Sequence, residues 1–334
     1  MKYINTFKTH ASYEEKLNGG VDISLPNVSY CKDVKDVHFN PYNTVEFYVG
    51  NITGTTPQTV KIYTDRNTSV DIQVSEGNKW YTYVLPKDKG LYRIEGYSVK
   101  KVVVKANINT RDSSIIPIIP ESTVEASLKG SNTSNVTDMY SMFNGCYHLT
   151  SLDLSNFDTS NVTYMSNMFE SCYNLTSLDL SNFDTSNVIS MSSMFSNCSG
   201  LKSLNLRNFN TSNVTYMTYM FDSCSGLTSL DLSGWDTSNV TYMDSMFYGC
   251  KGFTSLDLRN FNTSNVTSMD GMFQYCNSLT LLDLSGWDMR SVTNTSAMFR
   301  DCTSLKTIRM VGCSQDTIQK ITNVKPSGAT IVTE

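Results

Sequence analysis

Seven cysteines recur at a fixed interval of 26 residues, and thiolates act as nucleophiles and metal ligands. They are Cys146, Cys172, Cys198, Cys224, Cys250, Cys276 and Cys302. Such a row could form disulfides or bind zinc, but zinc ligands converge on one point, with short spacings such as C-x-x-C. Here one cysteine falls in each repeat, the number is odd, and each lies in an apolar stripe. We therefore predict a structural core column of reduced thiols that pack as small hydrophobic residues, with no metal site.

A column of acidic residues shares the same interval. Its members are Asp153, Asp179, Asn205, Asp231, Asp257 and Asp283, each beside inward-pointing leucines. Stacked oxygen ligands could bind a cation such as calcium; a solvated face whose repulsion is screened by salt is the alternative that we favour. We predict that this strand column faces a partner, together with Lys202, Arg207 and Arg259.

Tyrosines supply a second set of contact candidates. Tyr164, Tyr216, Tyr219 and Tyr242 are expected on the side of each repeat away from the strand. Tyrosine is enriched at protein interfaces, although covering the core is an alternative role for half or more of this set.

Catalytic chemistry finds no support in the sequence. The three histidines, His10, His38 and His148, are scattered along the chain. There is no G-x-S-x-G, H-E-x-x-H or P-loop motif, and no nucleophile is paired with a base. We predict that the protein is not an enzyme and uses no cofactor.

Charge is distributed unevenly over the 334 residues, whose net charge is −5. Residues 1–124 carry a net charge of +2, and the remainder carries −7. Binding to nucleic acid depends on clustered Lys and Arg, so we expect no nucleic-acid partner for the acidic part. No stretch approaches the roughly 20 apolar residues of a membrane helix, and the N-terminus lacks the apolar core of an export signal. We therefore expect neither membrane insertion nor ordinary secretion.

The repeat defines the elements that position these residues. Leu149, Leu152 and Leu154 form the L-x-x-L-x-L strand pattern of a leucine-rich repeat, and 26 residues fits the length of that repeat class. Apolar residues at spacings of three and four, from Val162 to Cys172, then predict a short helix or helical turn.

One repeat has a single apolar face and cannot fold alone, whereas stacked repeats bury a continuous core. We predict a leucine-rich-repeat solenoid of about seven coils in residues 124–313, each with a short parallel strand and a helical turn. Residues 314–334 are expected to cap its end, with a terminal helix opened by Ser314.

The repeat block resembles the BspA-type leucine-rich repeats of bacterial surface proteins, a group also found in mycoplasma lipoproteins. The shared block reads N-V-T-x-M-x-x-M-F-x-x-C-x-x-L-T-S-L-D-L-S. An aromatic residue, such as Phe157 or Trp235, stands where leucine-rich repeats usually have Asn, so we expect an aromatic spine instead of an asparagine ladder. The resemblance implies an extended surface for adhesion or recognition of a protein or cell-surface glycan, without catalytic activity.

The beginning of the chain differs from the repeats in its residue pattern. Short β-branched and aromatic runs between turn signals predict a small all-β, sandwich-like attachment domain in residues 1–112. Residues 113–123 contain two prolines and are expected to form a stiff, extended linker. Residues 1–42 are similar to leader segments in proteins of gut Bacteroides and crAss-like phages, which implies a role in attachment.

Three functional hypotheses follow. The first is a bacteriophage virion component, such as a capsid decoration, a head fibre or a tail-associated protein. Its β domain would anchor to other virion proteins while the solenoid contacts a host or partner surface, and virion proteins need no export signal because lysis releases them. The alternatives are a BspA-type adhesin on the bacterial cell surface and, with weaker support, a cytoplasmic interaction scaffold. Homo-oligomerisation is compatible with all three.

Overall fold

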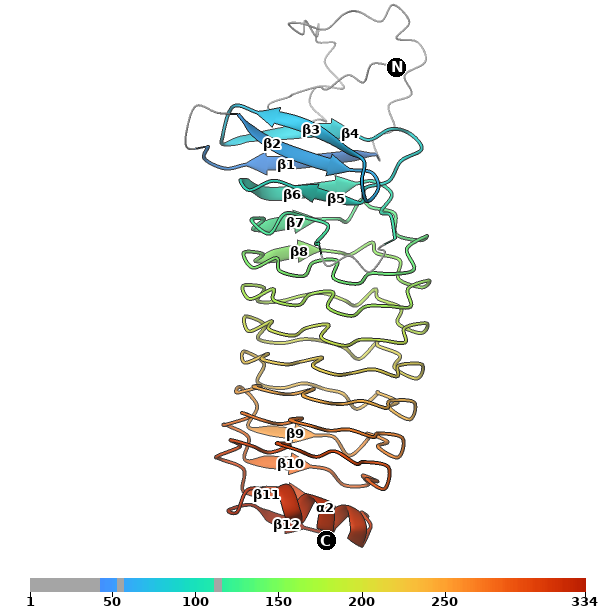
Figure 1. The fold of residues 1–334 in the computed structure, drawn as a ribbon, viewed down its shortest axis with the longest axis vertical. Coiled ribbons are helices and arrows are strands. Elements are labelled where there is room, and N and C mark those ends of the chain that lie inside the picture. Colours follow the sequence, from blue (N-terminus) through green and yellow to red (C-terminus); the bar gives the residue numbers. More distant parts are fainter. Residues whose placement is uncertain (1–42, 53–56, 111–115) are drawn as a thin grey trace, which may run out of the picture.

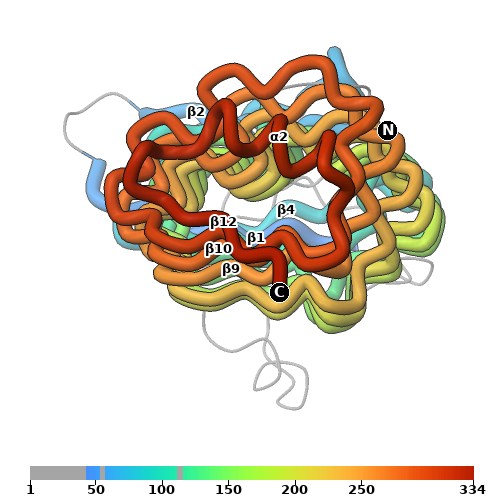
Figure 2. The backbone as a smooth tube through the Cα atoms, turned by 90° about the horizontal axis from the view of Figure 1, so that it is seen from below, coloured from blue at the N-terminus to red at the C-terminus, as the bar shows by residue number. Residues whose placement is uncertain are grey.

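A long stack of coils follows a small β region in the computed structural model, which describes residues 43–52, 57–110 and 116–334 (Figure 1). The predicted architecture is confirmed: a solenoid with few helices is preceded by a small sheet region. The solenoid has about nine turns, whereas about seven coils were predicted. Seen along the stack, successive coils follow nearly the same flattened outline (Figure 2). The leader resemblance in residues 1–42 lies outside the described residues.

Among the described residues, six strands build the N-terminal β region. They are β1 (Thr44–Val49), β2 (Gln58–Tyr63), β3 (Ser69–Val74), β4 (Lys79–Val84), β5 (Arg93–Glu95) and β6 (Val99–Lys105). Strand β1 pairs antiparallel with β4 and β6, and β2 pairs antiparallel with β3 and β5. Alternate residues of β1 are buried, including Phe47, whose ring stacks on Tyr81 at 5.6 Å between centroids. This alternation of buried and less buried residues is what a strand with one face against the core requires.

The first sheet continues from this region into the solenoid. Strand β6 pairs in parallel with β7 (Glu125–Ser127), which pairs in parallel with β8 (Ser151–Asp153). The segment predicted to be a linker contributes to this junction, because Ile118 and Ile119 are fully buried. The backbone N–H of Ile118 also donates to the carbonyl of Met142, at 2.8 Å. Residues 117–120 are therefore packed into the stack, while Ile116 and Glu121 beside them are exposed.

A second parallel sheet lies at the other end of the solenoid. It contains β9 (Ser255–Asp257), β10 (Leu281–Asp283), β11 (Thr307–Arg309) and β12 (Thr330–Val332), in the order β12-β11-β10-β9. Equivalent residues of neighbouring repeats pair directly, as Leu256 does with Leu282. Strand β12 adds a last rung beside β11.

A run of β-turns replaces the predicted helical turn. Met168 and Cys172 donate backbone hydrogen bonds three residues back, whereas Met165 and Phe169 donate to the next coil, at 3.1 and 2.9 Å. The residues at the third position of these turns have positive φ, for example 61° at Asn167. An α-helix would keep all of these N–H groups within one coil. The β-turn run buries the same apolar stripe and also bonds to the neighbouring coil.

Rings stack along the centre of the solenoid. The column comprises Phe143, Phe169, Phe195, Phe221, Phe247, Phe273 and Phe299, all buried. Neighbouring centroids are 5.6–5.9 Å apart with planes within 9° of parallel. The spacing of the coils thus suits offset ring stacking.

Buried threonines form a second internal ladder, in which each hydroxyl bonds to the next coil. Thr159 Oγ1 donates to the Asp184 carbonyl at 2.8 Å and accepts from the Asp184 N–H at 2.8 Å. Helix α2 (Gln315–Val324), capped by Ser314 as predicted, closes the ladder. Its buried Thr317 accepts a hydrogen bond from the N–H of Met289, which occupies the threonine position of the last full repeat.

The same isosteric change at two buried threonines should have opposite effects. Thr159→Val leaves the Asp184 N–H and C=O unsatisfied and should lower the free energy of unfolding by about 1–3 kcal/mol. Thr123 is also fully buried, but its Oγ1 has no hydrogen-bond partner, so Thr123→Val should raise the stability. Thermal and urea denaturation of the two variants measure the effect. Equal destabilisation by both would contradict the role of the ladder.

Candidate functional site

The cysteine column lies inside the solenoid. All seven residues of the column are buried, and each is a free thiol. From Cys172 onward, the thiol of each donates to the carbonyl of a phenylalanine in the preceding coil, for example to Phe143 at 3.2 Å. Burial raises the pKa of these thiols, to about 11 for Cys302 and further for Cys172. These groups are therefore held as neutral thiols, away from solvent.

The acidic column closes turns. The side-chain oxygen of each member accepts the backbone N–H of the residue two positions later, at 3.0–3.3 Å. Such Asx turns explain why Asn205 can replace Asp in the column. Hydrogen bonding to the Ser181 backbone lowers the pKa of Asp179. Ser233, followed by Arg207, lowers the pKa of Asp231 to about 2. The column thus has a structural role in addition to its predicted role as a partner-facing surface.

Charges on the acidic column are partly neutralised. Arg207 pairs with Asp231 at 2.8 Å and Arg259 with Asp257 at 2.7 Å. Among the described residues, no three His, Cys, Asp or Glu side chains gather closely enough to hold a metal ion. Each carboxylate of the column instead accepts a backbone N–H of its own turn, so the geometry of the described part gives no support to a cation ladder.

A ladder of asparagine hydrogen bonds runs beside the aromatic spine. The spine itself occupies the position where leucine-rich repeats usually have Asn. Phe157 and Phe183 are buried and stack at 6.4 Å. Outside them, Asn161 Nδ2 donates to the Ser134 carbonyl of the preceding coil at 2.8 Å, and the equivalent asparagines repeat this bond. These asparagine hydrogen bonds were not predicted from the sequence, although the regular spacing of S-N-V in successive repeats indicates them.

Tyrosines form the most exposed aromatic groups on the β-turn face. Tyr164, Tyr216, Tyr219 and Tyr242 are 42–46% exposed. The rings of Tyr216 and Tyr242 stack at 5.8 Å with planes 4° apart. The structure thus places these four predicted contact residues at the surface. Tyr147 and Tyr173 form another exposed stacked pair, which sequence analysis did not single out.

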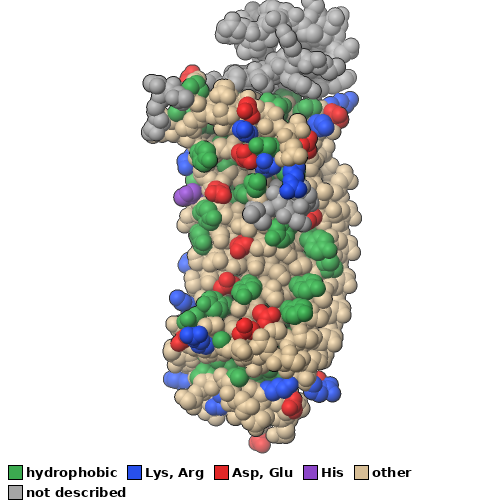
Figure 3. Space-filling model, in the orientation of Figure 1, with side chains coloured by type: hydrophobic (Ala, Val, Ile, Leu, Met, Phe, Trp, Pro, Cys, Tyr) green, Lys and Arg blue, Asp and Glu red, His purple; other side chains and the backbone are tan. Residues whose placement is uncertain are grey.

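Basic residues are absent from one part of the solenoid. Residues 130–201 contain no Lys or Arg and six Asp or Glu. Figure 3 shows the same trend on one face, where basic side chains gather toward the two ends while hydrophobic and acidic groups are scattered between them. The only histidine in the described residues, His148, is exposed on an early coil. This part of the surface suits a neutral or basic partner.

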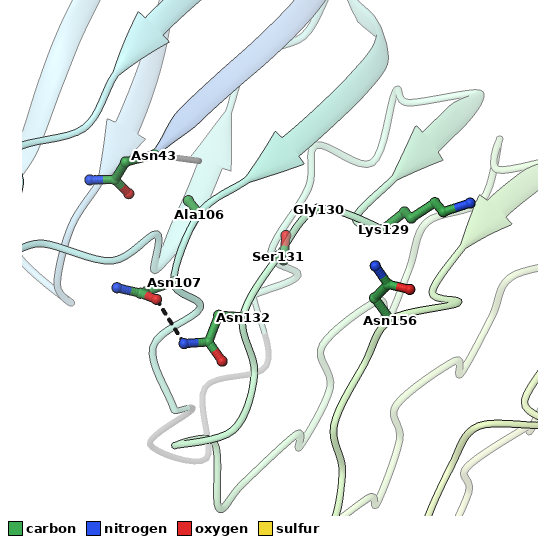
Figure 4. A pocket seen from close by; sticks show the side chains of 8 residues that line it. All are labelled: Asn43, Ala106, Asn107, Lys129, Gly130, Ser131, Asn132 and Asn156. Atoms are coloured by element: carbon green, nitrogen blue, oxygen red, sulfur yellow. Dashed lines mark hydrogen bonds between the residues drawn. The ribbon is translucent and has the colours of Figure 1, made fainter. Parts of the chain in front are cut away.

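A cavity of about 350 Å³ lies where the β region meets the first coils. It is lined by Asn43, Ala106, Asn107, Lys129, Gly130, Ser131, Asn132 and Asn156 (Figure 4). Asn132 Nδ2 donates to Asn107 Oδ1 at 3.0 Å, and the Asn43 amide donates to the Pro86 carbonyl at 2.8 Å. The Lys129 side chain extends away from Asn43 (Figure 4). The polar groups of this cavity therefore do not converge on one point.

Comparison with protein families identifies the repeat. The family model described as "Mycoplasma protein of unknown function, DUF285" matches residues 119–229 and again residues 223–323. Together these matches span more than half of the chain. The chain belongs to this family. A comparison with curated proteins gave no match.

The DUF285 matches coincide with the solenoid. They begin at the buried isoleucines of the junction and end within α2. The family signature is thus the repeated coil itself. In the described part of the chain, no helix has the length and apolar character needed to cross a membrane.

Turn-closing aspartates should make the solenoid sensitive to acid. The pKa values of Asp153, Asp179 and Asp231 are lowered in the folded state, so their stabilisation is complete above the ordinary value of 3.8 and is lost as the pH falls toward about 2. The melting temperature should therefore drop steeply in that window. Replacing all three by Asn keeps the turns and removes the titration, so this variant should lose less stability in acid. Identical pH profiles would contradict the assignment.

Alkylation should separate the buried thiols from the terminal one. Cys313 is only half-buried, whereas the column thiols are buried; burial raises the pKa of Cys313 and of the column thiols alike, so the difference in access decides the rate. Treatment of the native protein with iodoacetamide, read by peptide mass spectrometry, should label Cys313 before any cysteine of the column and leave the column unlabelled until unfolding. Labelling of Cys224 in the folded protein at the rate of Cys313 would show that the core opens.

Proposed function

We propose that this protein is a non-enzymatic recognition protein whose solenoid presents a rigid surface to a protein or glycan. The observation that carries the proposal is the in-register stacking of outward side chains, as in the Tyr216–Tyr242 pair at 5.8 Å. Such a surface is fixed before binding, which reduces the entropy lost on association.

The groups with catalytic potential are already engaged. The column thiols are buried within the stack. The acidic column accepts backbone hydrogen bonds from its own turns, as Asp179 does from Ser181 at 3.0 Å. These engagements support a binding role for the repeats over catalysis.

We further propose that the protein is a component of a phage virion, anchored to other virion proteins through its N-terminal region. The similarity of residues 1–42 to leader segments of crAss-like phage proteins supports this location. The continuous sheet β4-β1-β6-β7-β8 supports a mechanical link between anchor and solenoid, because it joins both regions through backbone hydrogen bonds.

A BspA-type adhesin on a bacterial surface is the second candidate. The repeat block N-V-T-x-M-x-x-M-F and the match to a mycoplasma family support it. Both candidates use the solenoid for recognition, and they differ in the particle that carries it.

Mass spectrometry of purified virions and surface labelling of intact cells separate the two. Peptides from both halves of the chain should be found in virions banded from a lysate of the source. Absence from virions together with labelling on intact cells would establish the adhesin, and absence from both would contradict a surface-recognition role.

A further inference from the structure

We propose that the tyrosine column of the β-turn face binds a neutral pyranose ring at Ser190, between Tyr164 and Tyr216. The inference rests on the proposed recognition function and names a ligand class for it. The ring would enter a place in the column where this protein has a small side chain.

The column is defined by backbone pairing. Parallel bridges join Tyr164 to Ser190, Ser190 to Tyr216, and Tyr216 to Tyr242. Side chains at directly paired positions of parallel segments point to the same side. The tyrosines and Ser190 therefore form one row, in which Ser190 interrupts the rings.

The interruption has the width of one ring. Tyr164 and Tyr216 lie two coils apart, about 9.5 Å at the usual spacing of about 4.7–4.9 Å between strands. They make no ring contact with each other in the described structure, whereas Tyr216 and Tyr242 in adjacent coils stack at 5.8 Å. A ring above Ser190 would lie at stacking distance from both neighbours. The internal column from Phe143 through Phe169 to Phe195 shows three rings at this interval, 5.6 and 5.7 Å apart.

Hydroxyl groups surround the interrupted position. Ser190, 8% exposed, lies at its base with its Oγ 2.7 Å from Ser166 Oγ. Thr218 Oγ1 donates to Ser192 Oγ at 3.0 Å in the adjoining column. A pyranose offers apolar C–H groups on its faces and hydroxyls around its edge, which matches rings above and below and hydroxyls beside them.

Charge and chemistry distinguish the occupant. Residues 130–201, which include Tyr164 and Ser190, contain no Lys or Arg, so an anionic sugar or nucleotide would find no basic partner there. The coil of Tyr216 carries Lys202 and Arg207, and Arg207 is already paired with Asp231. An aromatic side chain of a protein would stack equally well, but it carries at most one edge hydroxyl to meet Ser192, whose Oγ accepts from Thr218 and whose O–H can still donate. A neutral sugar satisfies both requirements.

Filling the gap tests the proposal. Ser190→Tyr should extend the stack from Tyr164 to Tyr242 and occupy the ligand position. Ser268→Tyr is the matched control, because it adds a ring next to Tyr242 in the same column and leaves the gap at Ser190 open. Melting curves of both variants establish that the solenoid is intact, and Tyr164→Ser removes one wall as an independent variant.

Saturation-transfer NMR and calorimetry with cellotriose, chitotriose and mannotriose provide the readout. At least one trisaccharide should bind the unaltered chain and the Ser268→Tyr variant alike, and affinity should fall about tenfold or more in Ser190→Tyr and Tyr164→Ser, as expected for losing a stacked ring. Binding of none of the three sugars, equal binding by Ser190→Tyr, or binding of a tyrosine-containing peptide in their place would overturn the proposal. Its failure would leave the virion and cell-surface measurements unaffected.

Discussion

Register between coils is the constraint on which this structure depends. Every coil bonds to the next through backbone groups and through the threonine hydroxyls, as at Thr159 and Asp184. Buried polar groups that lose such partners cost free energy. Because each bond spans a fixed number of residues, one extra residue in a coil would displace all of these partners together. The need to keep these partners in register explains why successive repeats keep the same spacing of 26 residues.

Register also dictates which side chains can fill the core. Each core residue meets the residue of the equivalent position in the next coil, so most core side chains must pack against the same or a similar residue type. Phenylalanine does so by offset stacking, with planes 0° apart between Phe247 and Phe273. Cysteine fits the narrow position beside it, because a thiol is small and can donate to the Phe carbonyl of the preceding coil. The unusual abundance of Met, Phe and Cys thus reflects one arrangement of core side chains that recurs in successive repeats.

Much of this fold can be predicted from the sequence, because the 26-residue repeat is visible in the sequence itself. The period gives the solenoid, and Ser314 marks the terminal helix. The β-turn run could not be distinguished from a helix, because both place Met165, Met168 and Phe169 on one side. The packing of Ile118 and Ile119 was missed for a different reason: Met142, the hydrogen-bond partner of Ile118, belongs to the next coil and is identified only once the register is known.

The candidate surface was predictable in part. Residue type and spacing predicted the aspartates as an exposed strand column and the four tyrosines as contact candidates on the side away from the strand. The turn-closing role of Asp179, and the interruption of the tyrosine row at Ser190, depend on which backbone groups lie beside them. These relations arise from the three-dimensional pairing of coils.

The closing of the threonine ladder by Thr317 has a consequence for length. Both ends of the stack are specialised, by the β sheet at one end and by α2 at the other, whereas the coils between them are interchangeable. Recombination between near-identical repeats can therefore insert or delete whole coils without disturbing either terminus. The number of repeats therefore sets the distance between the β region and α2, so the length of the solenoid can change by whole coils in a single genetic event.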